Sequence, residues 1–231
     1  MNTAFFDTGV LSGCMADVLA HKRPVLIVFD LDGTLTDSAA LGRVLFKRVF
    51  ALLGFGEISD ELADSFNGPS SDEVCRIMGI EHRKDEYNAL IDEVETALVR
   101  SSGVVYPGTL EMLAALAPHA YLTILTNGSP AYCETCLTEY GFAPYIAKHS
   151  GFAPGVTKAM RIREWEQETG ARRVIVVGDR KTDIDNARAA GAYAVGVTFG
   201  MGSAEELSGA DALCGTMEQV KEACLRVIAE I

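Results

Sequence analysis

The sequence predicts an α/β protein with a parallel β-sheet, into which an all-helical segment is inserted. Two observations predict the sheet: apolar runs rich in β-branched residues occupy residues 25–29, 121–125 and 173–177, and polar residues directly follow each run. Strands buried on both faces of a parallel sheet show such continuous apolar runs. The third observation concerns residues 39–102, which show the spacing of amphipathic helices and no strand pattern.

The inserted segment is predicted to contain several helices. Apolar side chains recur at intervals of three and four in its first part, and Gly54 and Gly56 then end the run. Ser71 is a suitable N-cap for a helix that follows it. No strand is required between Ser38 and Gly103, where the α/β pattern resumes. The helices expected in this segment cover residues 41–52, 60–66, 72–78 and 84–100.

Strands and helices alternate in the rest of the chain. Ser129 and Pro130 fit the N-cap and the first position of a helix. We therefore expect an amino-terminal extension over 1–21, an α/β core domain formed by 22–38 and 103–231, and a helical domain over 39–102. Helices are expected over 109–116, from 130 onwards, and over 158–169, 183–190 and 217–228; further strands are expected over 145–147 and 192–197.

Composition excludes several classes of partner. The chain of 231 residues has a net charge of −12, which argues against a nucleic-acid backbone or an anionic membrane as its main partner. No apolar run reaches the length of about 18 residues that a spanning helix needs, and the amino terminus lacks the basic start of a signal peptide. Six scattered cysteines indicate reduced thiols, and hence a cytoplasmic protein.

Two carboxylates follow the first strand. Asp30 and Asp32 are two positions apart, so in an extended segment they point the same way. At about 5 Å and an effective dielectric near 20, their repulsion costs roughly 3 kcal/mol. A bound cation or a shared proton would offset it. Because ligands of open α/β sheets bind at the carboxyl ends of the strands, this pair predicts a functional site.

Polar residues follow two other strands and suit phosphoryl transfer. Thr126 and Asn127 stand before a helix start, where a hydroxyl, an amide and free backbone N–H groups bind phosphate oxygens. Asp179 and Asp183 add carboxylates for Mg²⁺, which prefers oxygen ligands. One carboxylate can attack phosphorus and carry an aspartyl-phosphate, while a second one exchanges protons with the leaving group and water. Lys158 would offset the negative charge.

These residues form four motifs, and through them the chain resembles the hydrolases of the haloacid dehalogenase superfamily, in particular the phosphoglycolate-phosphatase-like members. The resemblance covers about residues 24 to 231. The first and fourth motifs, each preceded by an apolar strand, are its most specific part. The motifs are Phe29-Asp30-Leu31-Asp32-Gly33-Thr34-Leu35, Leu125-Thr126-Asn127-Gly128, Lys158, and Val177-Gly178-Asp179-Arg180-Lys181-Thr182-Asp183.

The resemblance implies a Rossmann-like core and a Mg²⁺-dependent phosphoric monoester hydrolase. It implies Asp30 as nucleophile, Asp32 as general acid/base and Lys158 as a catalytic and phosphate-binding residue. The helical domain would be a cap that selects a small phosphorylated metabolite, with phosphoglycolate one candidate, in a monomer or homodimer. The implied metal ligands are Asp30, Asp32 through its backbone carbonyl, Asp179 and Asp183; the implied phosphate-binding residues are Gly33, Thr34, Thr126, Asn127, Gly128 and Lys158.

Several alternatives stay open at this stage. Many relatives have proline after the third-motif lysine, whereas this chain has Ala159, so Lys148 and Lys181 compete with Lys158 for the role. A phosphosugar mutase of the same superfamily, a phosphonate hydrolase and a non-enzymatic phosphate-binding module are the other functions considered. The Cys133/Cys136 pair is interpreted as thiols on a helix face, because no second pair is placed to complete a zinc site.

Overall fold

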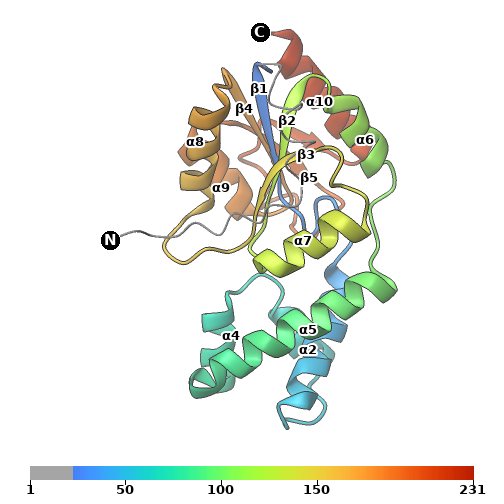
Figure 1. Cartoon of the computed structure of the whole chain (residues 1–231), viewed down its shortest axis with the longest axis vertical. Coiled ribbons are helices and arrows are strands. Elements are labelled where there is room, and N and C mark those ends of the chain that lie inside the picture. The colour runs from blue at the N-terminus through green and yellow to red at the C-terminus, as the bar shows by residue number, and fades with distance from the viewer. Residues whose placement is uncertain (1–22) are drawn as a thin grey trace.

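A computed structural model describes residues 23–231, and the predicted amino-terminal extension over 1–21 lies outside these described residues. Its centre is a six-stranded sheet in the order β3-β2-β1-β4-β5-β6 (Figure 1). Each of the five strand pairings is parallel, so every carboxyl end lies at one edge. The strands are β1 (Val25–Phe29), β2 (Ala120–Leu125), β3 (Ile146–Ser150), β4 (Arg173–Gly178), β5 (Tyr193–Val197) and β6 (Ala212–Cys214).

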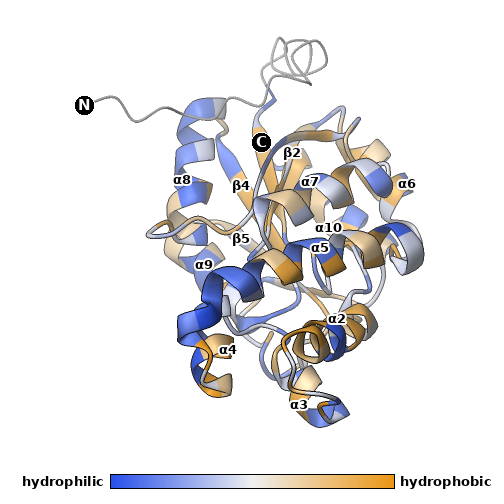
Figure 2. Cartoon of the chain, turned by 60° about the horizontal axis from the view of Figure 1, so that its bottom comes forward, coloured by the Kyte–Doolittle hydropathy of each residue, from blue (hydrophilic) through white to orange (hydrophobic). Residues whose placement is uncertain are grey.

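Helices cover both faces of this sheet. Alternate residues of β1 explain why, since Val25, Ile27 and Phe29 pack into one core cluster and Leu26 and Val28 into another. In Figure 2 the strands of the sheet are coloured mainly as hydrophobic, whereas the helices Lys158–Thr169 and Lys181–Ala190 show hydrophilic stretches. One face packs against α6 (Thr109–Leu116), α7 (Pro130–Glu139) and α10 (Met217–Ala229), and the other against α8 (Lys158–Thr169) and α9 (Lys181–Ala190).

The helical insertion, residues 39–102, lies beyond the carboxyl ends of the strands (Figure 1). It has an apolar core of its own, in which Phe50 contacts the rings of Phe66 and Tyr87. Its last helix also packs against α7 of the α/β part, where Val99 joins the core of the sheet. The insertion consists of α2 (Ala39–Leu52), α3 (Asp60–Ser65), α4 (Ser71–Met78), the 3-10 turn η1 (Glu81–Arg83) and α5 (Lys84–Ser102).

The predicted class of fold is confirmed, and local differences have physical reasons. The α4 helix begins at Ser71 rather than after it, because the Ser70 hydroxyl accepts the backbone N–H of Glu73 and so serves as the N-cap. Strand β3 extends to Ser150, through polar residues that an edge strand tolerates. Strand β6, which the sequence analysis did not predict, has only three residues and therefore almost no periodicity.

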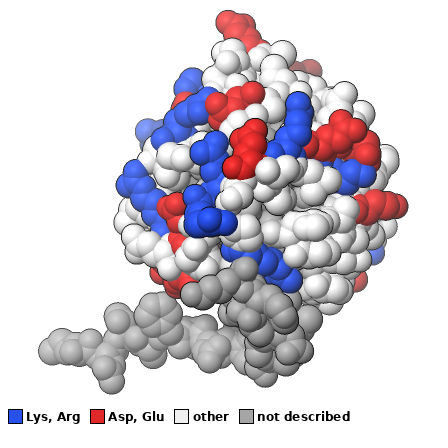
Figure 3. Space-filling view, turned by 90° about the horizontal axis from the view of Figure 1, so that it is seen from above, with Lys and Arg blue, Asp and Glu red and all other residues white. Residues whose placement is uncertain are grey.

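On the face opposite the insertion, basic and acidic side chains are interspersed (Figure 3). None of the helices in residues 23–231 is long and apolar enough to span a membrane. The insertion lies on the side of the carboxyl edge of the sheet, the edge at which open α/β sheets bind ligands.

Candidate active site

The site forms where the order of the strands reverses. Strand β1 has β2 on one side and β4 on the other, and such switch points are where open α/β sheets bind ligands. Phe29 and Val177 are partners in the register, and the Asp30 N–H donates to the Val177 carbonyl at 2.9 Å. The residues that follow β1 and β4 are thereby fixed side by side.

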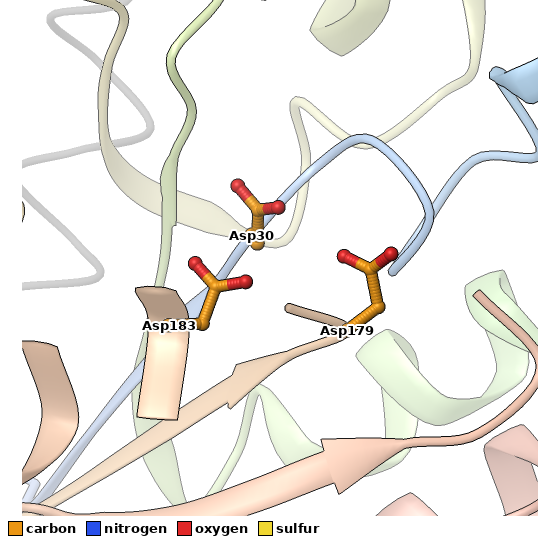
Figure 4. Close-up of side chains that lie close together, drawn as sticks. All are labelled: Asp30, Asp179 and Asp183. Carbon is orange, nitrogen blue, oxygen red and sulfur yellow. The ribbon is translucent and has the colours of Figure 1, made fainter. Parts of the chain in front are cut away.

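Three carboxylates converge at this point (Figure 4). Oxygens of Asp30, Asp179 and Asp183 lie within 4.8 Å of one another. Asp30 and Asp179 leave the ends of β1 and β4, whereas Asp183 comes from the first turn of α9. The Asp179 and Asp183 side chains are almost completely buried, and that of Asp30 is 11% exposed. The cluster therefore concentrates negative charge away from solvent.

Lys158 joins two of these carboxylates. Its Nζ donates to Asp30 Oδ1 and to Asp183 Oδ1, at 2.8 Å in both cases. It is the first residue of α8, whose N-cap Thr157 accepts the backbone N–H of Met160. Burial alone would lower the pKa of Lys158, but the two carboxylates raise it above its ordinary value. The lysine therefore stays charged beside the carboxylates.

Backbone and hydroxyl donors hold Asp179. The Met201 N–H donates to its Oδ2 at 2.7 Å, and the Thr34 hydroxyl donates to its Oδ1 at 3.3 Å. Gly33, with φ of 75°, lies so close that a Cβ there would come within 2.2 Å of the carboxylate. Burial nevertheless raises the pKa of Asp179 to about 6. The loop after β1 and the loop after β5 thus both position one carboxylate.

Asp183 is fixed by the start of its own helix. The Arg180 backbone N–H donates to its Oδ2 at 3.2 Å. Gly178 leaves room for it, since a Cβ on Gly178 would lie 2.3 Å from the Asp183 Cβ. Asp183 therefore both caps α9 and faces Lys158.

Electrostatics of the cluster favour a cation. Burial is the first cause that raises the pKa of Asp30 well above its usual range; Asp183 raises it further, and Lys158 opposes both. With all four groups ionised, three carboxylates and one lysine carry a net charge of −2. Burying such charge without compensation is costly. Convergent carboxylate oxygens fit a hard divalent ion such as Mg²⁺, so the donor set suits the predicted metal.

Asp32 lies apart from this cluster and makes different contacts. Its Oδ2 accepts from the Thr126 hydroxyl at 3.2 Å, and its Oδ1 accepts from the Tyr132 hydroxyl at 2.5 Å. From the insertion, Glu95 of α5 faces the same region, one turn before Val99. Burial, followed by the charge of Asp32, raises the pKa of Glu95 well above its ordinary value. The two carboxylates of the first motif thus occupy separate environments.

The structure brings several predicted phosphate-binding residues together. Thr126, Asn127 and Lys158 line one small cavity of about 30 Å³. The Thr126 side chain is buried, and its hydroxyl accepts the Gly128 N–H at 3.0 Å, whereas Asn127 is exposed. Thr34 points instead to Asp179.

The two competing lysines lie elsewhere. Lys148 pairs with Glu168 and Lys181 pairs with Asp185, so neither contacts the carboxylate cluster. Cys133 and Cys136 are buried on α7, and burial raises the pKa of the Cys133 thiol to about 12. These thiols pack in the core of the sheet, as expected for residues on an apolar helix face.

Three contributors were not identified from the sequence. Tyr132 lies on α7, one hundred residues from Asp32, and nothing in its local sequence sets it apart. Glu95 belongs to a helix whose apolar stripe explains its fold without reference to the site. Met201 acts through its backbone, and the signal that could have suggested it is the pair of glycines on either side.

The fold and site define an α/β enzyme with an acidic centre at the switch point of its sheet. A model of the family described as haloacid dehalogenase-like hydrolase matches residues 27–197. The chain therefore belongs to the haloacid dehalogenase-like hydrolases.

Relatives and structures agree with this assignment. The chain is 31% identical over 202 residues to a phosphoglycolate phosphatase of Mesorhizobium japonicum, covering 78% of this chain and 84% of that protein. It is 26% identical over 190 residues to the tyrosine-protein kinase PtkA of Mycobacterium tuberculosis, covering 80% of this chain but only 65% of the relative's length. The structure of a predicted phosphoglycolate phosphatase from Haemophilus somnus superimposes with a TM-score of 0.75 at 20% identity, over 88% of this chain and 99% of that one, and so shares the fold.

Proposed function

We propose that the protein is a Mg²⁺-dependent phosphatase that hydrolyses a small phosphomonoester through an aspartyl-phosphate on Asp30. The observation that carries this proposal is the contact of Lys158 with Asp30 and Asp183 inside a buried carboxylate cluster. A lysine held between a nucleophile and a neighbouring acid offsets charge on both the nucleophile and an arriving phosphate. The phosphatase relatives support the same reaction class.

The side chains divide the reaction between them. An Asp30 oxygen attacks phosphorus, and the bond from phosphorus to the leaving oxygen breaks as the Asp32 carboxyl gives that oxygen its proton. Asp32 then takes a proton from water as this water attacks the phosphorus of phospho-Asp30, which releases phosphate and restores the Asp30 carboxylate. Thr126 and Lys158 hold the non-bridging oxygens throughout. The separate environments of Asp30 and Asp32 support these unequal roles.

The metal site is proposed on the same residues. Asp30, Asp179 and Asp183 would hold Mg²⁺, together with the backbone carbonyl of Asp32, and Asp183 would bind either directly or through water. The ion, when bound, supplies Lewis-acid stabilisation of the charge on the transferring phosphoryl group. Thr34 and the Met201 N–H orient Asp179 for this role.

The insertion is proposed as a cap that selects the leaving group of a small phosphorylated metabolite. Its packing against α7 and the position of Glu95 near Asp32 support this role. Phosphoglycolate is one candidate substrate, since relatives carry that name. We propose a cytoplasmic enzyme that acts as a monomer or homodimer.

Hydrolysis of p-nitrophenyl phosphate, measured with Mg²⁺ and with EDTA, tests the reaction class. We expect activity with Mg²⁺, its loss in EDTA, and recovery when Mg²⁺ is restored. Activity that survives EDTA would overturn the metal assignment. A folded protein that binds phosphate but hydrolyses no ester in a broad phosphomonoester screen would show a binding module instead.

A further inference from the structure

Tyr132 and Thr126 are the described residues that hydrogen bond the Asp32 carboxyl group. The Tyr132 hydroxyl donates to one carboxylate oxygen at 2.5 Å, and the Thr126 hydroxyl donates to the other at 3.2 Å. Both donors belong to the segment that follows β2. The orientation of Asp32 is therefore set within the α/β part of the protein.

The local structure aims the Tyr132 ring at this carboxyl group. Tyr132 lies in the first turn of α7, and its backbone N–H donates to the hydroxyl of the N-cap Ser129 at 3.1 Å. Gly128 leaves the path open, because a Cβ on Gly128 would come within 2.5 Å of the ring. The side chain is only 4% exposed. The helix cap and the glycine thus fix where the hydroxyl can reach.

The two donors differ in the hydrogen bonds that they would make during the reaction. Thr126 has a single hydroxyl proton, which its proposed phosphate contact would take away from Asp32. Tyr132 has no phosphate contact in this scheme, so its phenolic O–H stays free to donate to Asp32. When Thr126 turns to the phosphate, Tyr132 is the described donor that still holds Asp32.

We propose that Tyr132 is a positioning residue that holds the Asp32 carboxyl group in line with the leaving oxygen of the substrate. This inference rests on the proposed function of Asp32. Tyr132 acts only through Asp32 and transfers no proton itself; it keeps the carboxyl group from turning away while the bond from phosphorus to the leaving oxygen breaks. Its contribution is therefore greatest where the leaving oxygen most needs a proton.

The leaving-group dependence of Tyr132→Phe tests the proposal. An alkyl phosphate needs its leaving oxygen protonated, whereas p-nitrophenolate leaves readily without a proton. We expect kcat/KM for an alkyl phosphate to fall about tenfold to a hundredfold, a part of the roughly 10²–10⁴-fold that acid–base catalysis contributes, while that for p-nitrophenyl phosphate falls less than about threefold. kcat/KM is the right quantity because it reports the step in which the first phosphorus–oxygen bond breaks.

Tyr140→Phe is the matched control, because Tyr140 follows the end of the same helix and its hydroxyl packs against Gly103. Tyr140→Phe should leave kcat/KM unchanged for both substrates. Equal losses for the two substrates in Tyr132→Phe, or no loss for either, would overturn the positioning role. Crystal structures of the wild type and Tyr132→Phe give a readout without activity: an Asp32 carboxyl group with the same orientation in both would also overturn it. Absence of wild-type activity toward any ester would instead count against the proposed function.

Discussion

The carboxyl edge of the sheet and the helical insertion use charged residues in opposite ways. At the edge, Lys158 and Asp183 form an ion pair with side chains 11% and 3% exposed. In the insertion, Arg43 pairs with Asp64 through side chains 47% and 41% exposed. Exposed pairs contribute little to stability because water and salt screen them, whereas buried charges interact strongly with any partner. The contrast indicates that the edge is arranged for chemistry and the insertion for a solvated fold.

The strongest test of this contrast is Asp30→Asn. We expect hydrolysis of an aryl phosphate to fall by about 10⁴-fold or more, because the nucleophile is removed. Asp185→Asn is the control, since Asp185 forms an exposed pair with Lys181 and should retain full activity. If Asp30→Asn stays active, Asp30 is not the nucleophile.

Lys158→Gln should have the next largest effect. It leaves Asp30 and Asp183 facing each other without their shared partner. We expect activity to fall by about 10²-fold or more and metal-free stability to fall by about 3–5 kcal/mol, measured by denaturant unfolding. Lys47→Gln, which breaks exposed pairs in the insertion with Glu57 and Asp60, should leave the unfolding midpoint and the activity unchanged. Equal effects of the two substitutions would contradict the contrast.

Asp179→Asn probes the pH dependence of the buried edge. The pKa of Asp179 is raised to about 6 from 3.8, so between these pH values the folded state binds the proton more tightly than the unfolded state. Metal-free wild type should therefore lose stability as pH rises from about 4 to 6, by up to about 3 kcal/mol. Asp179→Asn should lack this component.

The free energy of unfolding is measured in EDTA across that pH range for the wild type and for Asp179→Asn. The difference between the two proteins isolates the contribution of Asp179. Mg²⁺ should stabilise the wild type above pH 6, where the carboxylates are ionised, and should stabilise the variant much less. A wild-type curve parallel to that of the variant from pH 4 to 7 would show that Asp179 does not titrate as described.

Arg43→Gln should have the smallest effect. It removes the hydrogen bonds that Arg43 donates to Asp64 and Asp60 between α2 and α3. Because these groups are exposed, we expect no change in the unfolding midpoint beyond experimental error and no change in kcat. A clear loss of activity would mean that this pair positions the insertion over the site, and would weaken the distinction between the two regions.

The sequence by itself determined the residues of the motifs and the elements other than the three-residue strand β6. Asp30 and Asp32 could be predicted because the strand before them and the turn after them are formed by neighbouring residues. A continuous apolar run indicates a strand that is buried on both faces. Asp179 and Asp183 were predicted from the strand and turn of the fourth motif, whereas Lys158 was preferred over Lys148 and Lys181 through the resemblance, and the convergence of these residues was only an expectation. The helical insertion was likewise readable from its periodicity.

Tertiary structure decided which of these residues meet. Lys158 contacts Asp30, 128 positions away in the sequence, and Tyr132 contacts Asp32, 100 positions away. These contacts depend on the order of the strands and on which helix covers which face of the sheet. Tyr132 carried no local signal because its role is a single hydrogen bond. Met201 was marked only by the glycine on either side of it, because a backbone N–H is common to nearly all residues. Short-range periodicity encodes the elements, but the contacts that assemble the site arise only when β1, β2 and β4 lie side by side.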